Sequence, residues 1–232
     1  MGESIKSSAS LSFASTAFDD IPHLSSSTLY NIEIGGIGTH GIFQFVKGSL
    51  SSRVEYAISD RITLALEGTL GAIMPSKSVK SSEISPCDRF YIGGVGIYGL
   101  RGFHEHGVGP MSPRRLNTFS SGDHRRFDSL GGTFILSVLG ALRFPLPIPS
   151  LSALGIEGQM FGNAGILGDL GERTMRITSL RKFLNDNVRV TIGVGLFWPL
   201  QIGQLEANIC RVINKGRHDY AKNGIQFGIT PY

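Results

Sequence analysis

The sequence has no long apolar run, little charge and only two cysteines. No stretch approaches the roughly 18–20 apolar residues that a membrane-spanning helix needs, because the best run, Phe134 to Leu142, ends at Arg143. There is no charged and then apolar start with a cleavage site, so no secretory signal is predicted. Cys87 and Cys210 lack metal-site spacing. Two unpaired thiols are favoured over a disulfide, which leaves the redox compartment open.

Charged residues make up only 17% of the chain, and the formal net charge is +4. This weak positive charge permits nucleic acid or anionic lipid as a partner but argues for neither. The mean hydropathy of +0.08 is too polar for a helical membrane protein, whereas the charge is too sparse for a typical soluble one. Glycine is abundant, with 31 of 232 residues, about twice the average share. This mixture favours strands that are half apolar and half small or polar.

The main pattern that is present is an alternation with a period of two, which is typical of β-strands. In residues 62–74, for example, Leu64 and Leu66 share one face, and Thr63 and Glu67 share the other. Nine segments show this alternation and predict nine strands: residues 5–13, 30–34, 41–56, 62–74, 134–143, 154–163, 189–196, 205–209 and 224–229.

Two all-β architectures produce such alternation: a soluble sandwich and a transmembrane barrel. Three features favour an antiparallel transmembrane β-barrel. The segments are near the ~9–11 residues that a tilted membrane crossing requires, and their polar face is rich in Gly, Ser and Thr. Aromatic residues also lie near strand ends, at Phe144, Trp198 and Tyr232, where an interfacial girdle is expected. On periodicity alone, a soluble β-sandwich stays open.

Three segments interrupt the strand pattern. From Arg176 to Asn185, apolar residues recur at helical spacing, which predicts one short amphipathic helix between two strands. Pro110 to Asp128 is interpreted as the return limb of a long loop. Pro145 to Pro149 predicts a short, stiff turn.

No motif predicts an enzyme. Gly94, Gly96 and Gly99 have dinucleotide-binding spacing, but no helix is predicted to begin there, so the match is interpreted as coincidence. His104 and His106 define no metal geometry, and no nucleophile elbow is present. The arginines at positions 114, 115, 125 and 126 lack the interleaved aromatic residues of single-strand nucleic-acid binders. We therefore predict no catalytic residue, no metal, no cofactor and no nucleic-acid partner.

One glycine-rich stretch directs the functional interpretation. It runs from Arg89-Phe90-Tyr91-Ile92-Gly93-Gly94 through Leu100-Arg101-Gly102-Phe103 to Gly109-Pro110. Its glycines indicate tight turns or close approach, and Arg101 lies between aromatic residues. The pattern suits a loop that folds into a confined space and is held there by one charged group. It resembles the signature of the outer-membrane barrel-assembly superfamily. That superfamily has BamA-type bacterial members and a mitochondrial member, the barrel subunit of the sorting and assembly machinery (SAM complex).

The resemblance implies a sixteen-stranded barrel of which residues 1–232 form the C-terminal portion, with a signature loop at about residues 87–128. An open or incomplete barrel is therefore expected, because the early strands and the upstream polypeptide-transport domain are absent. The chain begins in strand-like sequence, which agrees with a missing upstream portion. The signature-loop residues implied by the match are Gly93, Gly94, Leu100, Arg101, Gly102 and Phe103.

In the family, the signature arginine pairs with lumen-facing polar groups on downstream strands, including acidic groups in bacterial members. Here the corresponding positions are Asn163 and Ala141, so an anionic partner at those two sites is not expected. A guanidinium can hold a bidentate contact in a fixed plane. We therefore predict that Arg101 contacts Glu157 or Asn163, which share a lumen-facing parity.

The final predicted strand resembles the sorting signal that mitochondrial outer-membrane barrels carry in their last strand. The matching residues of the gate and sorting signal are Lys222, Gly224, Ile225, Phe227 and Ile229. A strand of this kind, with one lipid-facing row and a flexible glycine, can add to an open sheet edge. It would form one lip of a lateral gate.

The resemblance implies that the chain inserts and folds β-barrel precursor proteins into the mitochondrial outer membrane. Its partners would be unfolded barrel precursors, accessory subunits of the assembly complex and the lipid bilayer. A bacterial or plastid outer membrane is the alternative location. Two alternative functions stay open: a polypeptide-transport pore of the same superfamily, for secretion or plastid import, and a soluble β-sandwich binding module.

Overall fold

The computed structural model describes residues 7–18, 23–37, 44–76, 79, 84–96, 98–113, 127–169, 183–184, 186–201 and 203–230. Within them, nine long strands form one antiparallel sheet in the order β1-β2-β3-β4-β7-β8-β9-β10-β11. The strands are β1 (Ser8–Phe18), β2 (Leu24–Gly35), β3 (Phe45–Ser59), β4 (Ile62–Pro75), β7 (Phe134–Pro145), β8 (Glu157–Gly168), β9 (Arg189–Leu200), β10 (Gly203–Asn214) and β11 (Gly224–Thr230). A separate two-stranded ribbon consists of β5 (Met111–Pro113) and β6 (Phe127–Ser129).

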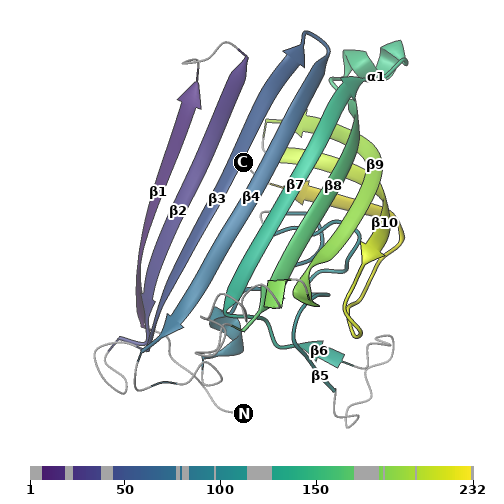
Figure 1. The fold of residues 1–232 in the computed structure, drawn as a ribbon. Helices are drawn as coiled ribbons and strands as arrows, with labels where there is room; N and C mark the ends of the chain where they lie inside the picture. Colours follow the sequence, from purple (N-terminus) through teal and green to yellow (C-terminus); the bar gives the residue numbers. More distant parts are fainter. Residues whose placement is uncertain are drawn as a thin grey trace.

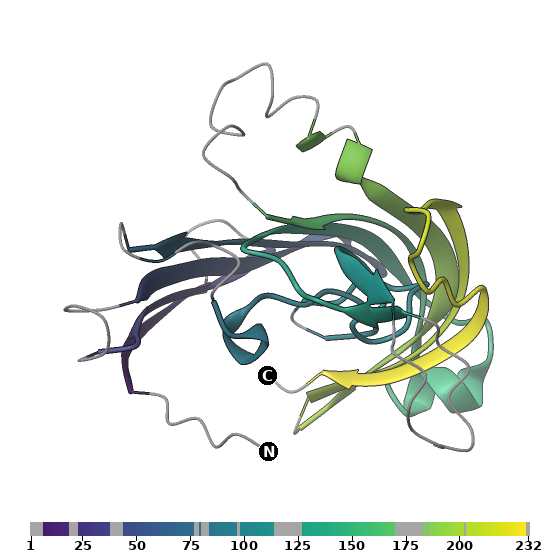
Figure 2. The same ribbon diagram turned by 90° about the horizontal axis from the view of Figure 1, so that it is seen from below.

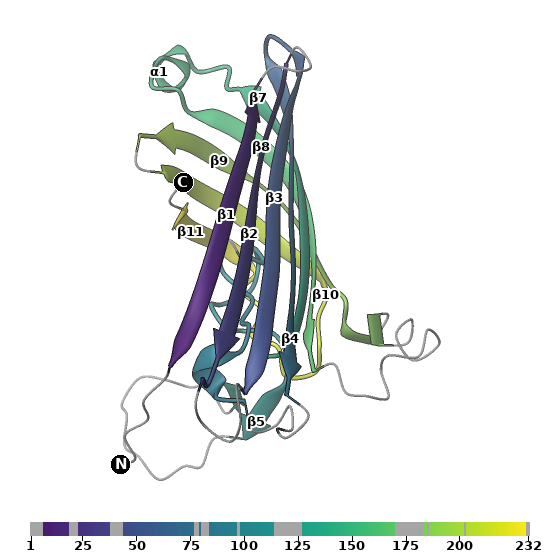
Figure 3. The ribbon, with the colours of Figure 1, turned by 90° about the vertical axis from the view of Figure 1, so that its left-hand side faces the viewer.

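The sheet curves into an open trough, with β1 at one edge and β11 at the other (Figure 1; Figure 3). Each long strand pairs with the long strands nearest to it in sequence, and the two longest connections join β4 to β7 and β8 to β9. The predictions of an all-β fold, of nine antiparallel strands and of an unclosed sheet are confirmed. Most of the strands extend beyond their predicted segments.

The convex face of the trough is apolar and exposed. Outward residues of neighbouring strands stand opposite one another; Leu70, for example, pairs with Leu50 on β3 and with Leu136 on β7. Along β11, Phe227 is 72% exposed. In the part of the chain that the structure describes, no second sheet covers these rows. A soluble sandwich would bury them between two layers, so the β-sandwich alternative is contradicted.

The largest apolar core lies on the concave face, between the sheet and the segment that joins β4 to β7. This segment enters the trough and fills part of it (Figure 2). Buried loop residues pack there against buried strand residues; the cluster consists of Phe45, Ile73, Ile84, Phe90, Ile92, Leu100, Phe103, Val108, Ile135 and Leu167. The loop is therefore a structural part of the interior.

The described helix does not lie where one was predicted. α1 (Pro149–Ala153) begins at Pro149, the last residue of the segment predicted as a stiff turn. Pro149 suits the first turn because its missing N–H has no intrahelical partner there. Gly155, at φ +73°, ends the helix with hydrogen bonds typical of a Schellman motif. The helix predicted from Arg176 to Asn185 lies almost entirely outside the described residues. No helix in the described ranges is both long and apolar enough to cross a membrane.

Candidate functional site

The tip of the signature loop is joined to the sheet by a buried ion pair between Arg101 and Glu206 of β10. The Nε–Oε2 distance is 2.7 Å and the Nη2–Oε1 distance is 2.6 Å, which is bidentate geometry. The two side chains are 5% and 0% exposed. Burial alone would lower the pKa of Arg101, but the hydrogen bonds and charge of Glu206 raise it above its ordinary value. The guanidinium therefore stays charged while it anchors the loop.

Two amide side chains complete the surroundings of the carboxylate. Gln159 of β8 and Asn208 of β10 donate to Glu206 Oε2 at 3.3 and 2.8 Å, respectively. Gln159 Nε2 also donates to Asn208 Oδ1 at 2.7 Å. We call Arg101, Gln159, Glu206 and Asn208 the tip cluster. Since a buried charge is stabilised only when its lone pairs are satisfied, these hydrogen bonds and Arg101 together compensate the burial of the Glu206 carboxylate.

Glycines allow the loop tip to approach the wall so closely. Gly102 has φ +87°, and a Cβ there would lie 2.5 Å from Thr191 Cγ2 on β9. Gly93 has φ +137°, and a Cβ there would collide with the carbonyl oxygen of His104. Both positions combine a left-handed backbone with a close contact, so only glycine is accommodated. The amide of Gly94 donates to the Phe103 carbonyl at 3.1 Å and closes the tip.

The same tip is held by the last strand. The side chain of Gln226 on β11 is buried, and its Oε1 accepts from the amide of Gly102 at 2.8 Å. Its Nε2 donates to the carbonyl of Phe103 at 3.0 Å. The amide of Lys222 donates to the Gly102 carbonyl at 2.7 Å. The loop therefore contacts β10 through the charged side chain of Arg101. It contacts β11 and Lys222, just before that strand, through its backbone.

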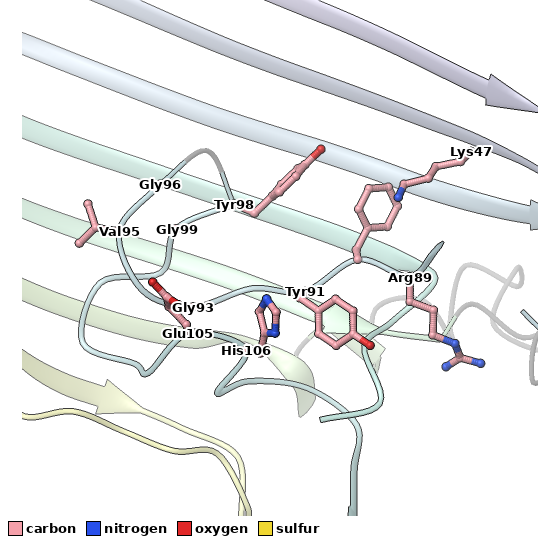
Figure 4. Close-up of a pocket in the computed structure, with 11 residues that line it drawn as sticks. Lys47, Arg89, Tyr91, Gly93, Val95, Gly96, Tyr98, Gly99, Glu105 and His106 are labelled. Atoms are coloured by element: carbon pink, nitrogen blue, oxygen red, sulfur yellow. The ribbon is translucent and has the colours of Figure 1, made fainter. Parts of the chain in front are cut away.

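Near the loop entrance, a pocket of about 320 Å³ lies between the loop and β3 (Figure 4). Tyr91 stacks on His106 with ring centroids 4.5 Å apart. Lys47 Nζ lies 4.6 Å from the centre of the Phe90 ring and donates to the Asp88 carbonyl at 2.9 Å.

The glycine spacing at Gly94, Gly96 and Gly99 is not followed by a helix: none begins in residues 100–113, all of which the structure describes. A dinucleotide-binding site of this type needs a helix at that point. The described residues contain no His, Cys, Asp or Glu group able to hold a metal ion.

A second set of charges, which we call the wall cluster, consists of Arg53, Glu55, Arg143 and Gln204. Glu55 Oε1 lies 2.6 Å from Arg53 Nη2 and 2.7 Å from Arg143 Nη1. Arg53 Nη1 donates to Gln204 Oε1 at 2.7 Å. This bond joins β3 to β10, which are not neighbours in the sheet. On β10, Gln204 and the tip-cluster residue Glu206 occupy successive concave-facing positions, so the two clusters adjoin.

The predicted partners of Arg101 are wrong: its carboxylate is Glu206. Glu157 instead lines a cavity of about 400 Å³ with Glu55 and Arg143 of the wall cluster. Asn163 is buried on the concave face, but neither of its side-chain amide atoms has a hydrogen-bond partner among the residues that the structure describes. Parity correctly identified which residues face the interior. It could not indicate how far the tip travels along the strands, and that depth selects Glu206.

Of the predicted gate residues, Lys222 precedes β11 and donates its amide to the loop, whereas the other four lie on β11. Ile225, Phe227 and Ile229 point outward and are exposed, and Gly224 begins the strand at φ +117°. These three outward-facing side chains do not meet the loop. Gln226 and Gly228, which alternate with these residues along β11, do meet the loop. A Cβ at Gly228 would collide with Val95 of the loop. A polar residue on the interior parity of the last strand was the available signal for Gln226, and it was missed.

Comparison with known proteins agrees with this arrangement. A family model described as the Omp85 superfamily domain matches residues 1–230. A SAM50-like protein of Schizosaccharomyces pombe is 29% identical over 232 residues, which cover 98% of this chain and 44% of that protein. The outer membrane protein assembly factor BamA of Neorickettsia risticii is 24% identical over 131 residues, 56% of this chain and 15% of that protein.

Among solved structures, BamA from Haemophilus ducreyi lacking POTRA domains 1–3 has a TM-score of 0.67. The match covers 94% of this chain and 41% of that chain at 20% identity, a level at which it shows the fold. The chain therefore spans less than half the length of the relatives that it matches.

Proposed function

Because the chain belongs to the Omp85 superfamily, we propose that it is the C-terminal part of a barrel that inserts and folds β-barrel precursors into the mitochondrial outer membrane. The membership confirms the family resemblance seen in the signature loop. The likeness over nearly the whole chain to a SAM50-like protein supports the mitochondrial assignment. The likeness to a BamA, named as an outer membrane protein assembly factor, supports assembly as the activity.

The observation that carries the proposal is that one loop tip holds both of the last two strands. Arg101 binds Glu206 on β10, and Gln226 on β11 binds the loop backbone. Among the described strands, β11 pairs only with β10, through seven residue pairs. Within the described part of the chain, its other edge offers unpaired N–H and C=O groups, which are costly in lipid and favour pairing with an added strand.

In this mechanism, the free edge of β11 is one lip of a lateral gate. A precursor's terminal strand pairs with the exposed backbone groups, and the free energy of strand pairing drives insertion. The loop sets the position of β11, since moving that strand inward or outward breaks the bonds of Gln226. The proposed substrate is thus recognised mainly by its backbone, and no cofactor takes part.

The test measures assembly of a radiolabelled porin precursor in mitochondria that contain only a variant full-length protein. We expect Arg101→Ala to lower assembly strongly while variant abundance stays normal. Arg61→Ala is the matched control, because Arg61 is exposed in the β3–β4 turn and its side chain has no hydrogen bond or ion pair within the described residues. Normal porin assembly in Arg101→Ala together with lost polypeptide translocation would instead support the transport-pore alternative.

A further inference from the structure

The convex face of the sheet carries one charged residue among the described strand positions. The pairing registers assign alternate residues of each strand to this face, and these residues are apolar, small or uncharged, with Arg211 of β10 as the exception. Arg211 pairs in register with outward-facing Ile192 and is exposed. In an outer-membrane barrel this face meets lipid, where an unpaired charge is unfavourable. Its presence calls for a counter-charge outside the chain.

Arg211 also differs from the strand arginines of the concave face. Arg53, Arg143 and Arg189 each form an ion pair with a carboxylate. Arg211 forms no hydrogen bond or ion pair through its side chain with any residue that the structure describes. Two exposed basic residues, Lys215 and Arg217, follow it at the end of β10 and increase the local positive charge.

A shallow apolar groove leads to Arg211 across five strands. Successive register partners form a row of Leu66, Gly140, Gly162, Ile192 and Arg211 on β4, β7, β8, β9 and β10. The two adjacent glycines place no side chain on the surface. A Cβ at Gly162 would have only Ile192 Cγ2 nearby, at 3.9 Å. The resulting groove has a volume of about 630 Å³ and is lined mainly by apolar residues, among them Phe161 and Cys210, with Arg211 at one end.

We propose that this groove binds one phospholipid with an anionic headgroup, its acyl chain along Gly140 and Gly162 and its phosphate on Arg211. A guanidinium binds phosphate oxygens through paired, charge-assisted hydrogen bonds. Arg211 lies three residues from the end of β10, so its long side chain can reach the headgroup layer. Apart from Arg211, the groove offers only apolar side chains and glycine backbone, which suits an acyl chain better than a polar protein segment.

The experiment uses the full-length protein purified in a nonionic detergent and native mass spectrometry with dioleoyl-phosphatidylglycerol or dioleoyl-phosphatidylcholine. We expect one retained phosphatidylglycerol and about tenfold weaker retention of phosphatidylcholine. Arg211→Gln should lower phosphatidylglycerol retention about tenfold, and Arg211→Lys should restore part of it. Arg61→Gln is the matched control for removing an exposed arginine.

Filling the groove tests the acyl-chain part of the site. Gly162→Leu should weaken retention, whereas Gly48→Leu should not, because Gly48 faces outward on β3 with nothing within 4 Å of its added Cβ and lies outside the groove. Heat-modifiable gel mobility verifies that each variant is folded, and Gly162→Ala replaces Gly162→Leu if the larger residue prevents folding. Equal retention of both lipids, or unchanged retention in Arg211→Gln, would overturn the proposal. So would a copurifying protein that depends on Arg211 while lipid retention does not.

Discussion

The tip cluster and the wall cluster adjoin on β10 but differ in how far they exclude water. In the tip cluster, Glu206 is completely buried and accepts hydrogen bonds from three side chains. In the wall cluster, the side chains of Arg53 and Glu55 are 24% and 30% exposed. Buried pairs are strongly destabilised when one partner is removed, whereas exposed pairs contribute little. The two clusters meet on β10 at Gln204 and Glu206, yet one holds the loop tip and the other lines the wall.

The largest effect is expected when one charge is removed from the tip cluster. Arg101→Ala leaves Glu206 buried without a counter-charge, and we expect a loss of about 3–5 kcal/mol in the free energy of loop docking. Hydrogen exchange at residues 98–113 should become faster. The double variant Arg101→Met, Glu206→Leu removes both charges and should recover most of the loss. Equal exchange in the single and double variants would show that the pair does not hold the loop.

A smaller effect is expected from Gln226, which contacts the same tip without a charge. Gln226→Ala leaves the amide of Gly102 and the carbonyl of Phe103 without their side-chain partner, at a cost of about 1–3 kcal/mol. Exchange of the Gly102 amide reports the change directly. Phe227→Leu is the control, because Phe227 lies next in the strand but points outward. The interpretation fails if both variants behave like the wild type.

Packing of β11 against the loop gives a third test, of similar or smaller size. Gly228→Ala places a Cβ against Val95 and should cost about 1–3 kcal/mol through overpacking. The heat-induced gel shift measures barrel stability. Adding Val95→Gly should restore it, and Gly48→Ala should change little, since no atom lies within 4 Å of that added Cβ.

The smallest effect is expected in the wall cluster. Arg53→Gln removes a partly exposed pair with Glu55, which we expect to cost about 0–1 kcal/mol. Because mobile ions screen exposed charges, even this difference should shrink between low and high salt in thermal unfolding. A loss as large as that of Arg101→Ala would remove the distinction between the two clusters.

The strand content was predictable because a half-apolar strand needs only local alternation, and residues 62–74 and 224–229 show it clearly. The signature loop was also recognisable, since glycines with positive φ at positions 93 and 102 leave a strong sequence pattern. In contrast, α1 was missed because a five-residue helix capped by Gly155 gives no helical period. The prolines indicate a stiff turn that ends at Pro149, where α1 begins.

The partner of Arg101 could not be predicted because it depends on distances between strands remote in sequence. Glu157, Asn163 and Glu206 all face the interior. Only the depth of the loop tip, set by packing of Phe103 and Leu100 against the sheet, brings Glu206 within reach. Gln226 was missed for a related reason: its partners are backbone groups, which carry no residue-specific signal.

The bond between Arg53 and Gln204 has a consequence for the width of the interior. β3 and β10 are separated in the sheet by β4, β7, β8 and β9, yet these two side chains meet across the trough. Any expansion of the enclosed space must pull them apart before it stretches the backbone pairing around the wall. Spin labels at positions 53 and 204 would therefore act as a ruler for dilation while a client polypeptide is engaged.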